Sequence, residues 1–193
     1  MASSLARTIL FTAFLFSTLA IHEAVADGNS EDTPSLEEIR HRLKSQKLTR
    51  LQFYMHDLVL VSDPTSVKVA GVPGSNRTTV NFGDLYVLDD PLTAGPSLTS
   101  TAVGRAQGIY SFSSKDSITL MMSVNMVFTG GKYNGSTVTV IGRNAVLNKV
   151  RELPVVGGTG AFRLARGFVQ ISTAILDAPT LSMVLNCSLY VLH

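Results

Sequence analysis

The chain has 193 residues, with 16 lysines and arginines, 14 aspartates and glutamates and a formal net charge of +2. This near balance gives no reason to expect binding to nucleic acid or to an anionic membrane surface. A chain of this length suits one domain after removal of an N-terminal targeting segment.

Residues 1–26 have the pattern of a secretory signal peptide. Arg7 precedes an apolar run over residues 9–21, and the small-residue sequence Ala24-Val25-Ala26 follows. This order matches the charged, apolar and cleavage regions of such peptides, and the run is shorter than a membrane-spanning helix requires. We therefore expect cleavage after Ala26 and secretion to the extracellular space, with no membrane attachment of the mature chain.

Residues 27–49 are polar, acidic around Glu31-Asp32 and basic from Arg40 to Lys47. A segment of this kind has too little apolar surface to fold alone, so we expect a flexible N-terminal arm with a short helix at 35–46. The folded domain is predicted to cover residues 50–193.

From Leu51 onward the pattern is almost wholly β. Turn sequences such as Asp89-Asp90-Pro91, Asn134-Gly135 and Gly157-Gly158 separate short strand-like runs. Eight short strands without crossover helices imply an antiparallel sheet, closed as a barrel or folded as a sandwich. An eight-stranded barrel has an interior large enough for one small ligand, which predicts a central pocket. The runs cover 51–62, 78–89, 101–113, 117–128, 136–142, 144–152, 161–175 and 181–192.

The first run places a carboxylate on its apolar face. Leu51, Phe53, Met55, Asp57 and Val59 alternate with more polar residues, and side chains in a strand alternate between its two faces. An unpaired buried carboxylate is costly, and a pocket that keeps one raises its pKa and makes it a usable acid. The alternative is a structural aspartate satisfied by an arginine or by backbone N–H groups.

The run at 101–113 indicates a cavity wall. One face begins with small residues from Ala102 to Gly108 and continues with Tyr110 and Phe112. Glycine within a strand is often found where a ligand or another backbone comes close, so these residues could leave room beside an aromatic wall. A tight bend at a barrel corner explains them equally well.

Few residue types remain for chemistry. The chain has one cysteine, Cys187, which reads as a buried small hydrophobe. His56 follows the opposite face from Asp57, so the two do not form a catalytic pair. Neither zinc nor calcium spacing occurs, and no metal or other cofactor is expected. A buried aspartate, a tyrosine and an arginine could bind a phenolic ligand and transfer protons, but not electrons. The candidates are Asp57, Tyr110, Arg105, Arg143, Arg151 and Arg166.

Three Asn-x-Ser/Thr sequons occur, which are acceptor sites for N-glycosylation in a secreted chain. Asn76 lies in a Gly/Pro/Ser-rich segment and Asn134 in a predicted turn, so both suit a glycan. Asn186 falls within a predicted strand and suits one less well.

Several sequence blocks resemble the signature sequences of plant dirigent proteins, and the resemblance covers roughly residues 50–193. The blocks are Phe53-Tyr-Met-His-Asp-Leu58, Val103-Gly-Arg-Ala-Gln-Gly-Ile-Tyr110, Tyr133-Asn-Gly-Ser-Thr137 and the long block from Val150 to Gly167. The resemblance implies a secreted, apoplastic, eight-stranded antiparallel β-barrel related to allene oxide cyclases, which assembles as a homo-oligomer.

The resemblance also implies a function. In the leading hypothesis, a separate laccase or peroxidase makes phenoxy radicals from monolignols such as coniferyl alcohol, and this protein directs their stereoselective coupling in lignan biosynthesis without oxidising them. In the alternative, the protein is an enzyme like the pterocarpan synthases of legumes, which dehydrate an isoflavanol through a quinone methide. A third hypothesis is a non-catalytic cell-wall or plant defence protein.

The resemblance carries over residue by residue. Asp57, Tyr110 and Arg151 match pocket residues of the family and are predicted to be catalytic, while Phe112 and Arg105 are predicted to contact the substrate. Lignan-forming members have a second pocket aspartate where this chain has Asn144, which can still hydrogen-bond to a substrate but cannot act as an acid. Those members also have a cysteine pair that this chain lacks.

Self-association is expected from two runs, 78–89 and 181–192, because both carry apolar residues on both faces. The family resemblance favours a trimer, and a dimer stays possible.

Overall fold

The computed structural model describes residues 34–73 and 80–193. The predicted signal peptide and the sequon at Asn76 lie outside the described residues. Helix α2 spans Leu36–Lys44, which is the short helix expected in the arm. A reciprocal cap begins it: the Ser35 N–H donates to Glu38 Oε2, and the Glu38 N–H donates to Ser35 Oγ. The helices in these ranges are all too short or too polar to cross a membrane.

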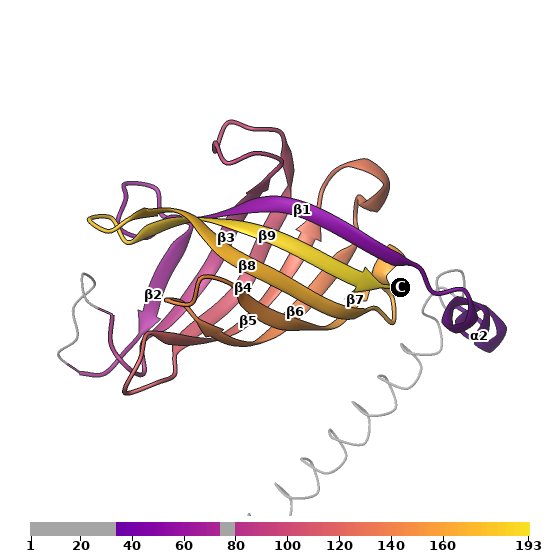
Figure 1. Cartoon of the computed structure of the whole chain (residues 1–193), viewed down its shortest axis with the longest axis horizontal. Helices are drawn as coiled ribbons and strands as arrows, with labels where there is room; N and C mark the ends of the chain where they lie inside the picture. The colour runs from indigo at the N-terminus through magenta and orange to yellow at the C-terminus, as the bar shows by residue number, and fades with distance from the viewer. Residues whose placement is uncertain (1–33, 74–79) are drawn as a thin grey trace, which may run out of the picture. The chain divides into compact units, whose positions relative to one another are not determined.

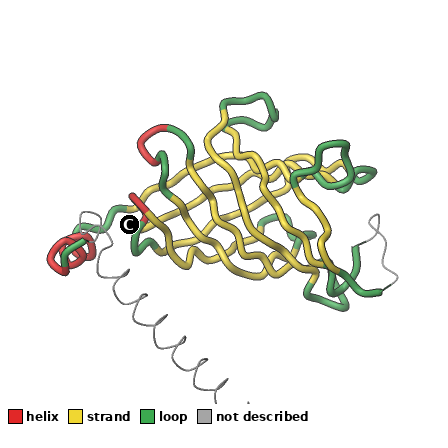
Figure 2. The backbone as a smooth tube through the Cα atoms, turned by 180° about the vertical axis from the view of Figure 1, so that it is seen from behind, coloured by secondary structure: helices red, strands yellow, loops and turns green. Residues whose placement is uncertain are grey.

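Within the described part of the chain, the strands form one antiparallel sheet of nine, in the order β1-β9-β8-β7-β6-β5-β4-β3-β2. β1 also pairs with β3, which closes eight strands into a barrel and leaves β2 as an extra strand beside β3 (Figures 1 and 2). The eight-stranded antiparallel barrel predicted from sequence is therefore confirmed. The strands are β1 (Leu48–Asp57), β2 (Ser66–Ala70), β3 (Leu85–Thr93), β4 (Ala102–Phe112), β5 (Thr119–Phe128), β6 (Thr137–Ala145), β7 (Arg151–Thr159), β8 (Arg166–Asp177) and β9 (Ser182–Leu192), with short 3-10 helices η1 (Gly131–Tyr133) and η2 (Gly160–Phe162).

The barrel core follows the alternation of the strands. In β5 the inward residues Met122, Val124 and Met126 are buried, and in β9 Cys187 and Leu189 are buried in the same way. Cys187 is a free thiol, and burial raises its pKa to about 12, so it stays protonated and acts as a small apolar side chain.

One end of the barrel is filled by rings. Phe162 of η2 packs against Tyr133, Phe128 and His193, with ring centroids 4.7, 5.6 and 4.8 Å away. His193 also hydrogen-bonds through Nδ1 to the Ala161 carbonyl. The C-terminal residue therefore helps to close this end of the barrel.

The structure corrects the predicted bounds of several strands, and the predicted run 144–152 covers only the end of β6, a loop over 146–150 and the start of β7. The predicted turn Asp89-Asp90-Pro91 lies inside β3, and the predicted turn Gly157-Gly158 lies inside β7. Proline fits in β3 because no partner needs the backbone N–H that it lacks. The Asp89 N–H points toward β2 and donates to the Thr65 carbonyl, and the nitrogen of residue 91 points to the same side, beyond the end of β2. Strand β2 was not predicted from sequence, although the turn sequence Asp63-Pro64 precedes it, because it has only five residues and buries only Ser66, so no apolar face marks it.

The glycines of β4 serve backbone packing. A Cβ at Gly104 would lie 2.1 Å from the Val127 carbonyl oxygen, and one at Gly108 would lie 2.1 Å from that of Ser123. Neither glycine lines the cavity described below. The close approach of β4 to β5 therefore accounts for these residues, and the cavity wall from β4 is made by Tyr110 and Phe112.

Candidate functional site

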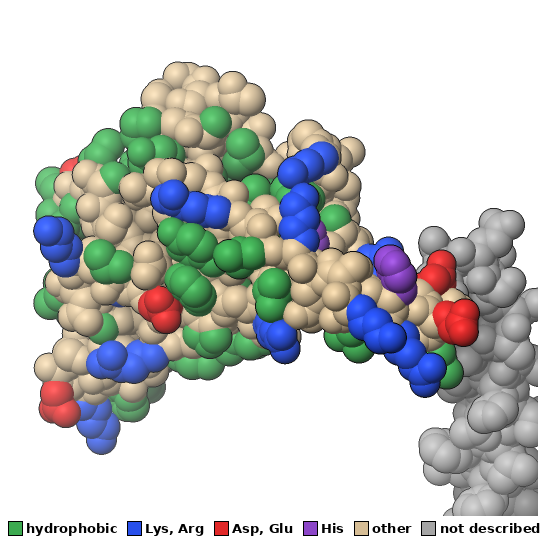
Figure 3. All heavy atoms as spheres, turned by 45° about the vertical axis from the view of Figure 1, so that its right-hand side comes forward, with side chains coloured by type: hydrophobic (Ala, Val, Ile, Leu, Met, Phe, Trp, Pro, Cys, Tyr) green, Lys and Arg blue, Asp and Glu red, His purple; other side chains and the backbone are tan. Residues whose placement is uncertain are grey.

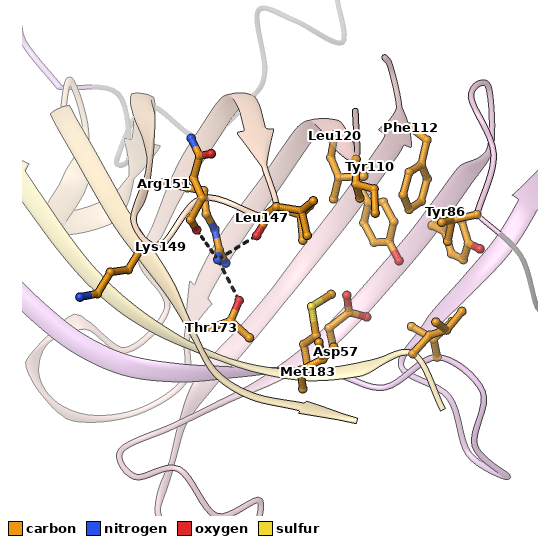
Figure 4. A pocket seen from close by; sticks show the side chains of 17 residues that line it. Asp57, Tyr86, Tyr110, Phe112, Leu120, Leu147, Lys149, Arg151, Thr173 and Met183 are labelled. Atoms are coloured by element: carbon orange, nitrogen blue, oxygen red, sulfur yellow. Dashed lines mark hydrogen bonds between the residues drawn. The ribbon is translucent and has the colours of Figure 1, made fainter. Parts of the chain in front are cut away.

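A cavity of about 420 Å³ lies at the end of the barrel opposite the ring-filled end (Figure 4). Its volume is within the range of small-molecule sites. Its walls are mostly apolar, and the polar side chains come from β1, β3, β4, β7, β8 and the loop between β6 and β7. The lining residues are Asp57, Val59, Val80, Tyr86, Tyr110, Phe112, Ile118, Leu120, Val146, Leu147, Asn148, Lys149, Arg151, Thr173, Leu176, Leu181 and Met183.

Asp57 is the acidic group of the cavity. It ends β1 opposite Met183 of β9, and its side chain is only 5% exposed. Burial raises its pKa to about 6, and a hydrogen bond with Ser66 opposes part of that rise. Its Oδ1 has no hydrogen-bond partner among the described residues. The carboxyl is therefore available to a ligand and titrates in a range where it can both donate and accept a proton.

An aromatic wall stands beside Asp57. The rings of Tyr86 and Tyr110 are stacked with centroids 4.9 Å apart, and Phe112 meets both rings edge-on. Ser66 Oγ donates to the Tyr110 hydroxyl at 3.1 Å. Burial raises the pKa of Tyr110, so its phenol stays protonated and can donate a hydrogen bond. Sequence reasoning missed Tyr86, although its strand alternation could have revealed it.

Arg151 is a buried cation on another wall (Figure 4). It begins β7, and its Nη1 donates to Thr173 Oγ1 at 2.8 Å and to the carbonyls of Val146 and Asn148 at 3.3 and 3.4 Å. No carboxylate lies within ion-pair distance of it in the described ranges, and its Nε has no hydrogen-bond partner there. Burial lowers its pKa. A guanidinium without a counter-ion favours an anionic oxygen of a ligand.

Asp90 is a second buried carboxyl that sequence reasoning missed, because it was assigned to a turn. The closing register pairs Tyr54 with Thr93 and Met55 with Leu92, where the β1–β3 pairing ends, and strand alternation turns Asp57 and Asp90 inward beyond it, as it does Met55 and Leu92. Asp90 has no exposed surface and does not line the cavity. Its Oδ1 accepts a hydrogen bond from Thr65 Oγ1 at 2.6 Å. Burial and the charge of Asp57 raise its pKa to about 9.

Comparison with known proteins decides the family. The family model of dirigent-like proteins matches residues 48–192. The chain belongs to the dirigent protein family. Dirigent protein 21 of Arabidopsis thaliana is 47% identical over 150 residues, covering 78% of this chain and 79% of that protein. Pterocarpan synthase 1 of Glycine max is 38% identical over 194 residues and covers all of both chains.

The structural comparison agrees. The solved structure of the pterocarpan synthase dirigent protein GePTS1 superposes with a TM-score of 0.74 at 41% identity, covering 77% of this chain and 86% of that one. The dirigent resemblance noted in the sequence blocks is therefore confirmed for the family and for the fold.

Two of the residues predicted for the dirigent pocket lie elsewhere. Arg105 is on the outer face of β4, where it pairs with Asp89 and its side chain is 41% exposed. The prediction that Arg105 contacts a substrate in the cavity does not hold, because alternation along β4 turns it away from the interior. Asn144 faces inward but is covered: its Nδ2 lies 3.1 Å from Met122 Sδ, and it does not line the cavity. Arg143 and Arg166 also lie outside the cavity wall.

The remaining predicted residues are placed as follows. Phe112 lines the cavity. His56 lies on the face opposite Asp57, where its Nε2 is 2.7 Å from Thr93 Oγ1. Asn134 is exposed at the end of η1, whereas Asn186 is half-buried in β9 between β1 and β8. Among the described residues no group of three His, Cys, Asp or Glu side chains could hold a metal ion.

Proposed function

We propose that this dirigent-family protein binds a phenolic compound in the cavity and removes water from it through a quinone methide, with Asp57 as the acid. The observation that carries the proposal is a cavity-facing carboxyl with a free oxygen and a raised pKa. The similarity to pterocarpan synthases of Glycine max and Glycyrrhiza echinata supports the same chemistry.

The proposed reaction needs only proton transfers. Asp57 gives its proton to a benzylic hydroxyl, the carbon–oxygen bond breaks, and water leaves. A phenol on the conjugated ring loses its proton to solvent as the quinone methide forms. A second hydroxyl of the substrate then adds to the methide carbon, its proton returns to Asp57, and the ring oxygen regains a proton from solvent. The sum is substrate to cyclised product plus water, with no oxidant.

Each wall has a part in this scheme. The Arg151 guanidinium stabilises the negative charge that develops on the phenol oxygen, because it has no carboxylate partner among the described residues. The stacked rings of Tyr86 and Tyr110 hold the substrate ring, and the Tyr110 hydroxyl donates a hydrogen bond to it. Because the bond forms while the intermediate is held between these walls, one face of the methide carbon is presented to the incoming hydroxyl.

Stereoselective coupling of phenoxy radicals is the second candidate function. Its support is the similarity to dirigent proteins such as Dirigent protein 21, at 47% identity over 150 residues, beside 40% over 151 residues for the Glycyrrhiza echinata pterocarpan synthase. In this case a laccase or peroxidase supplies monolignol radicals. The cavity then orients the two radicals as they couple, and Asp57 and Arg151 donate or accept protons on the quinone methide that results.

One experiment separates the two candidates. An isoflavanol is incubated with the protein without oxidant, and coniferyl alcohol is oxidised by a laccase with and without the protein, with products resolved by chiral chromatography. We expect isoflavanol turnover that falls about 100-fold or more in Asp57→Asn. Asp89→Asn is the matched control, because this carboxylate lies on the outer face of β3. No isoflavanol turnover with an enantiomeric excess in the laccase arm would favour coupling, and neither effect would reject both.

We also propose that the mature chain is secreted, carries glycans at Asn76 and Asn134, and associates with copies of itself. Self-association is supported by an apolar row on the outer wall: Val67, Val87 and Ile109 are cross-strand neighbours on β2, β3 and β4, and each is more than 40% exposed. Hydrophobic side chains also gather in the middle of the face seen in Figure 3.

A further inference from the structure

We propose that Asp90 is a positioning residue that shares one proton with Asp57 across the barrel seam, so that the pair carries a single negative charge when Asp57 is ionised. The role assigned to Asp57 rests on the proposed function, whereas the shared proton does not.

The geometry of the seam brings the two carboxyl groups together. β1 and β3 are joined by two residue pairs that end at Met55 and Leu92, and Asp57 and Asp90 lie two residues beyond these. Thr65 connects the two positions: its Oγ1 donates to Asp90 Oδ1 at 2.6 Å and lies 3.2 Å from the carbonyl oxygen of His56, next to Asp57. Alternation turns both side chains inward, as it does for Met55 and Leu92. In an antiparallel pair, side chains at opposite positions on one face are close neighbours.

The surroundings of Asp90 do not support a charged carboxylate. It is wholly buried, its one hydrogen bond is from the neutral hydroxyl of Thr65, and its Oδ2 has no partner among the described residues. A buried carboxylate needs a cation or several donors. The cation near it, Arg105, is on the outer face and paired with Asp89. Asp90 therefore keeps its proton.

A protonated Asp90 has a hydrogen to donate, and Asp57 is the acceptor that the seam offers. Two carboxyl groups that share a site cannot both ionise easily. The carboxyl group that faces the cavity, that of Asp57, therefore loses its proton first. A hydrogen bond from neutral Asp90 then stabilises the Asp57 carboxylate. The titratable groups that face this pair from the interior are Tyr86 on β3 and Tyr110 on β4. On the other faces of the neighbouring strands lie His56 and Asp89 with its partner Arg105, and β2 carries Lys68 with its partner Asp84.

This arrangement sets the acid strength of Asp57. Burial alone pushes the pKa of a carboxyl upward, and a donor behind it pulls the pKa back toward neutral pH. Asp57 can then give a proton to a leaving hydroxyl and take one back in the same cycle. Asp90 itself does not touch the cavity, so it acts through Asp57.

The test is a titration of the ligand-free mature protein with 13C-labelled aspartate side chains, followed by NMR. Wild type should show one aspartate that remains protonated at pH 7.5. In Asp90→Asn this signal should be missing, while in Asp57→Asn it should persist and titrate at least about one pH unit lower, because the opposing charge is gone. Asp89→Asn should change neither.

Three results would overturn the proposal. They are carboxylates at every aspartate of wild type at pH 7.5, a protonated signal that survives in Asp90→Asn, or an unchanged titration in Asp57→Asn. If Asp90→Asn does not fold, wild type and Asp57→Asn still decide the matter.

A second readout tests the link to Asp57. Asp90→Asn keeps a hydrogen-bond donor and should leave the Asp57 titration near its wild-type position, whereas Asp90→Leu removes the donor and should move it upward. An Asp57 titration that is the same in all three proteins would reject a positioning role. Because no substrate is present, these results are independent of whether the proposed reaction occurs.

Discussion

Asp57 ends strand β1 with its side chain inside the barrel, where a leucine would pack better. The buried charge costs free energy of folding whenever the carboxyl is ionised, and neither an arginine nor a backbone donor offsets it among the described residues. Residues of this kind that lower stability are common at functional sites. The aspartate therefore fits a chemical role better than a structural one.

The pKa shift of Asp57 has a consequence for stability. Its pKa in the folded chain is about 6, above its ordinary value of 3.8, so the stability it contributes is present below the ordinary value and is lost as pH rises through 6. We expect wild type to lose on the order of 2 kcal/mol relative to Asp57→Asn between pH 4 and pH 7. Urea unfolding of both proteins across this range checks it.

The comparison of the two proteins isolates Asp57. Burial lowers the pKa of His56, which makes stability fall as pH drops, but His56 is present in both proteins and cancels. Asp89→Asn serves as the control and should track wild type. Parallel curves for wild type and Asp57→Asn would contradict the expectation.

At the scale of elements, β4 positions the aromatic wall by lying unusually close to β5. The close approach requires Gly104 and Gly108, since any Cβ there would overlap a carbonyl oxygen of β5. Tyr110 and Phe112 follow on the same strand and turn into the cavity. The two glycines therefore do not contact the cavity but allow β4 to follow the course that directs Tyr110 and Phe112 into it.

Substitution of these glycines tests that role. Gly108→Ala should destabilise the barrel by about 2 kcal/mol or more, because overpacking against a hydrogen-bonded backbone has no flexible side chain to yield. Gly130→Ala is the control, since a Cβ there meets nothing within 4 Å and the residue is extended at φ −150°. Thermal unfolding of both variants measures the difference, and an equal loss in both would argue against the role assigned to β4.

At the scale of the whole molecule, the apolar row on the outer wall of the barrel is either covered by a partner or exposed to water. The row of Val67, Val87 and Ile109 crosses three adjacent strands, and the extra strand β2 forms its edge. Charged side chains would protect an edge of this kind in a monomer. The row therefore argues for contact with another copy of the chain.

Size-exclusion chromatography with light scattering tests this. We expect wild type to elute as an oligomer and Val87→Lys to shift toward the monomer, because a lysine there would be desolvated in the interface. Gln170→Lys, on the outer side of β8, is the control and should leave the mass unchanged. A monomeric wild type at micromolar concentration would refute the assignment.

The alternation of apolar residues was enough to predict the barrel and to single out Asp57, Tyr110 and Phe112. It succeeded for β4, β5 and β9 because their faces are distinct and turn residues mark their ends. Arg151 came from the family resemblance, since nothing local marks a buried arginine.

Other features depended on context that one sequence does not display. Asp90-Pro91 has the composition of a turn. It lies in a strand because, at the barrel seam, no partner strand needs the N–H that proline lacks. The error hid Asp90 and shifted β3. Arg105 was included among the predicted pocket residues although it lies an odd number of residues from Tyr110 on β4, which puts its side chain on the outer face. Parity along the strand would have excluded it.

The rings of Phe162 and His193 fill one end of the barrel, and the cavity lies at the other end. A tunnel would let reactant arrive and product depart by separate routes. A cavity with one opening would impose an order on the proposed dehydration, because the product and water would have to leave before the next molecule could enter. Under the proposed reaction, Leu147 and Lys149, which line the cavity and are exposed, would then affect turnover through the rate of product release.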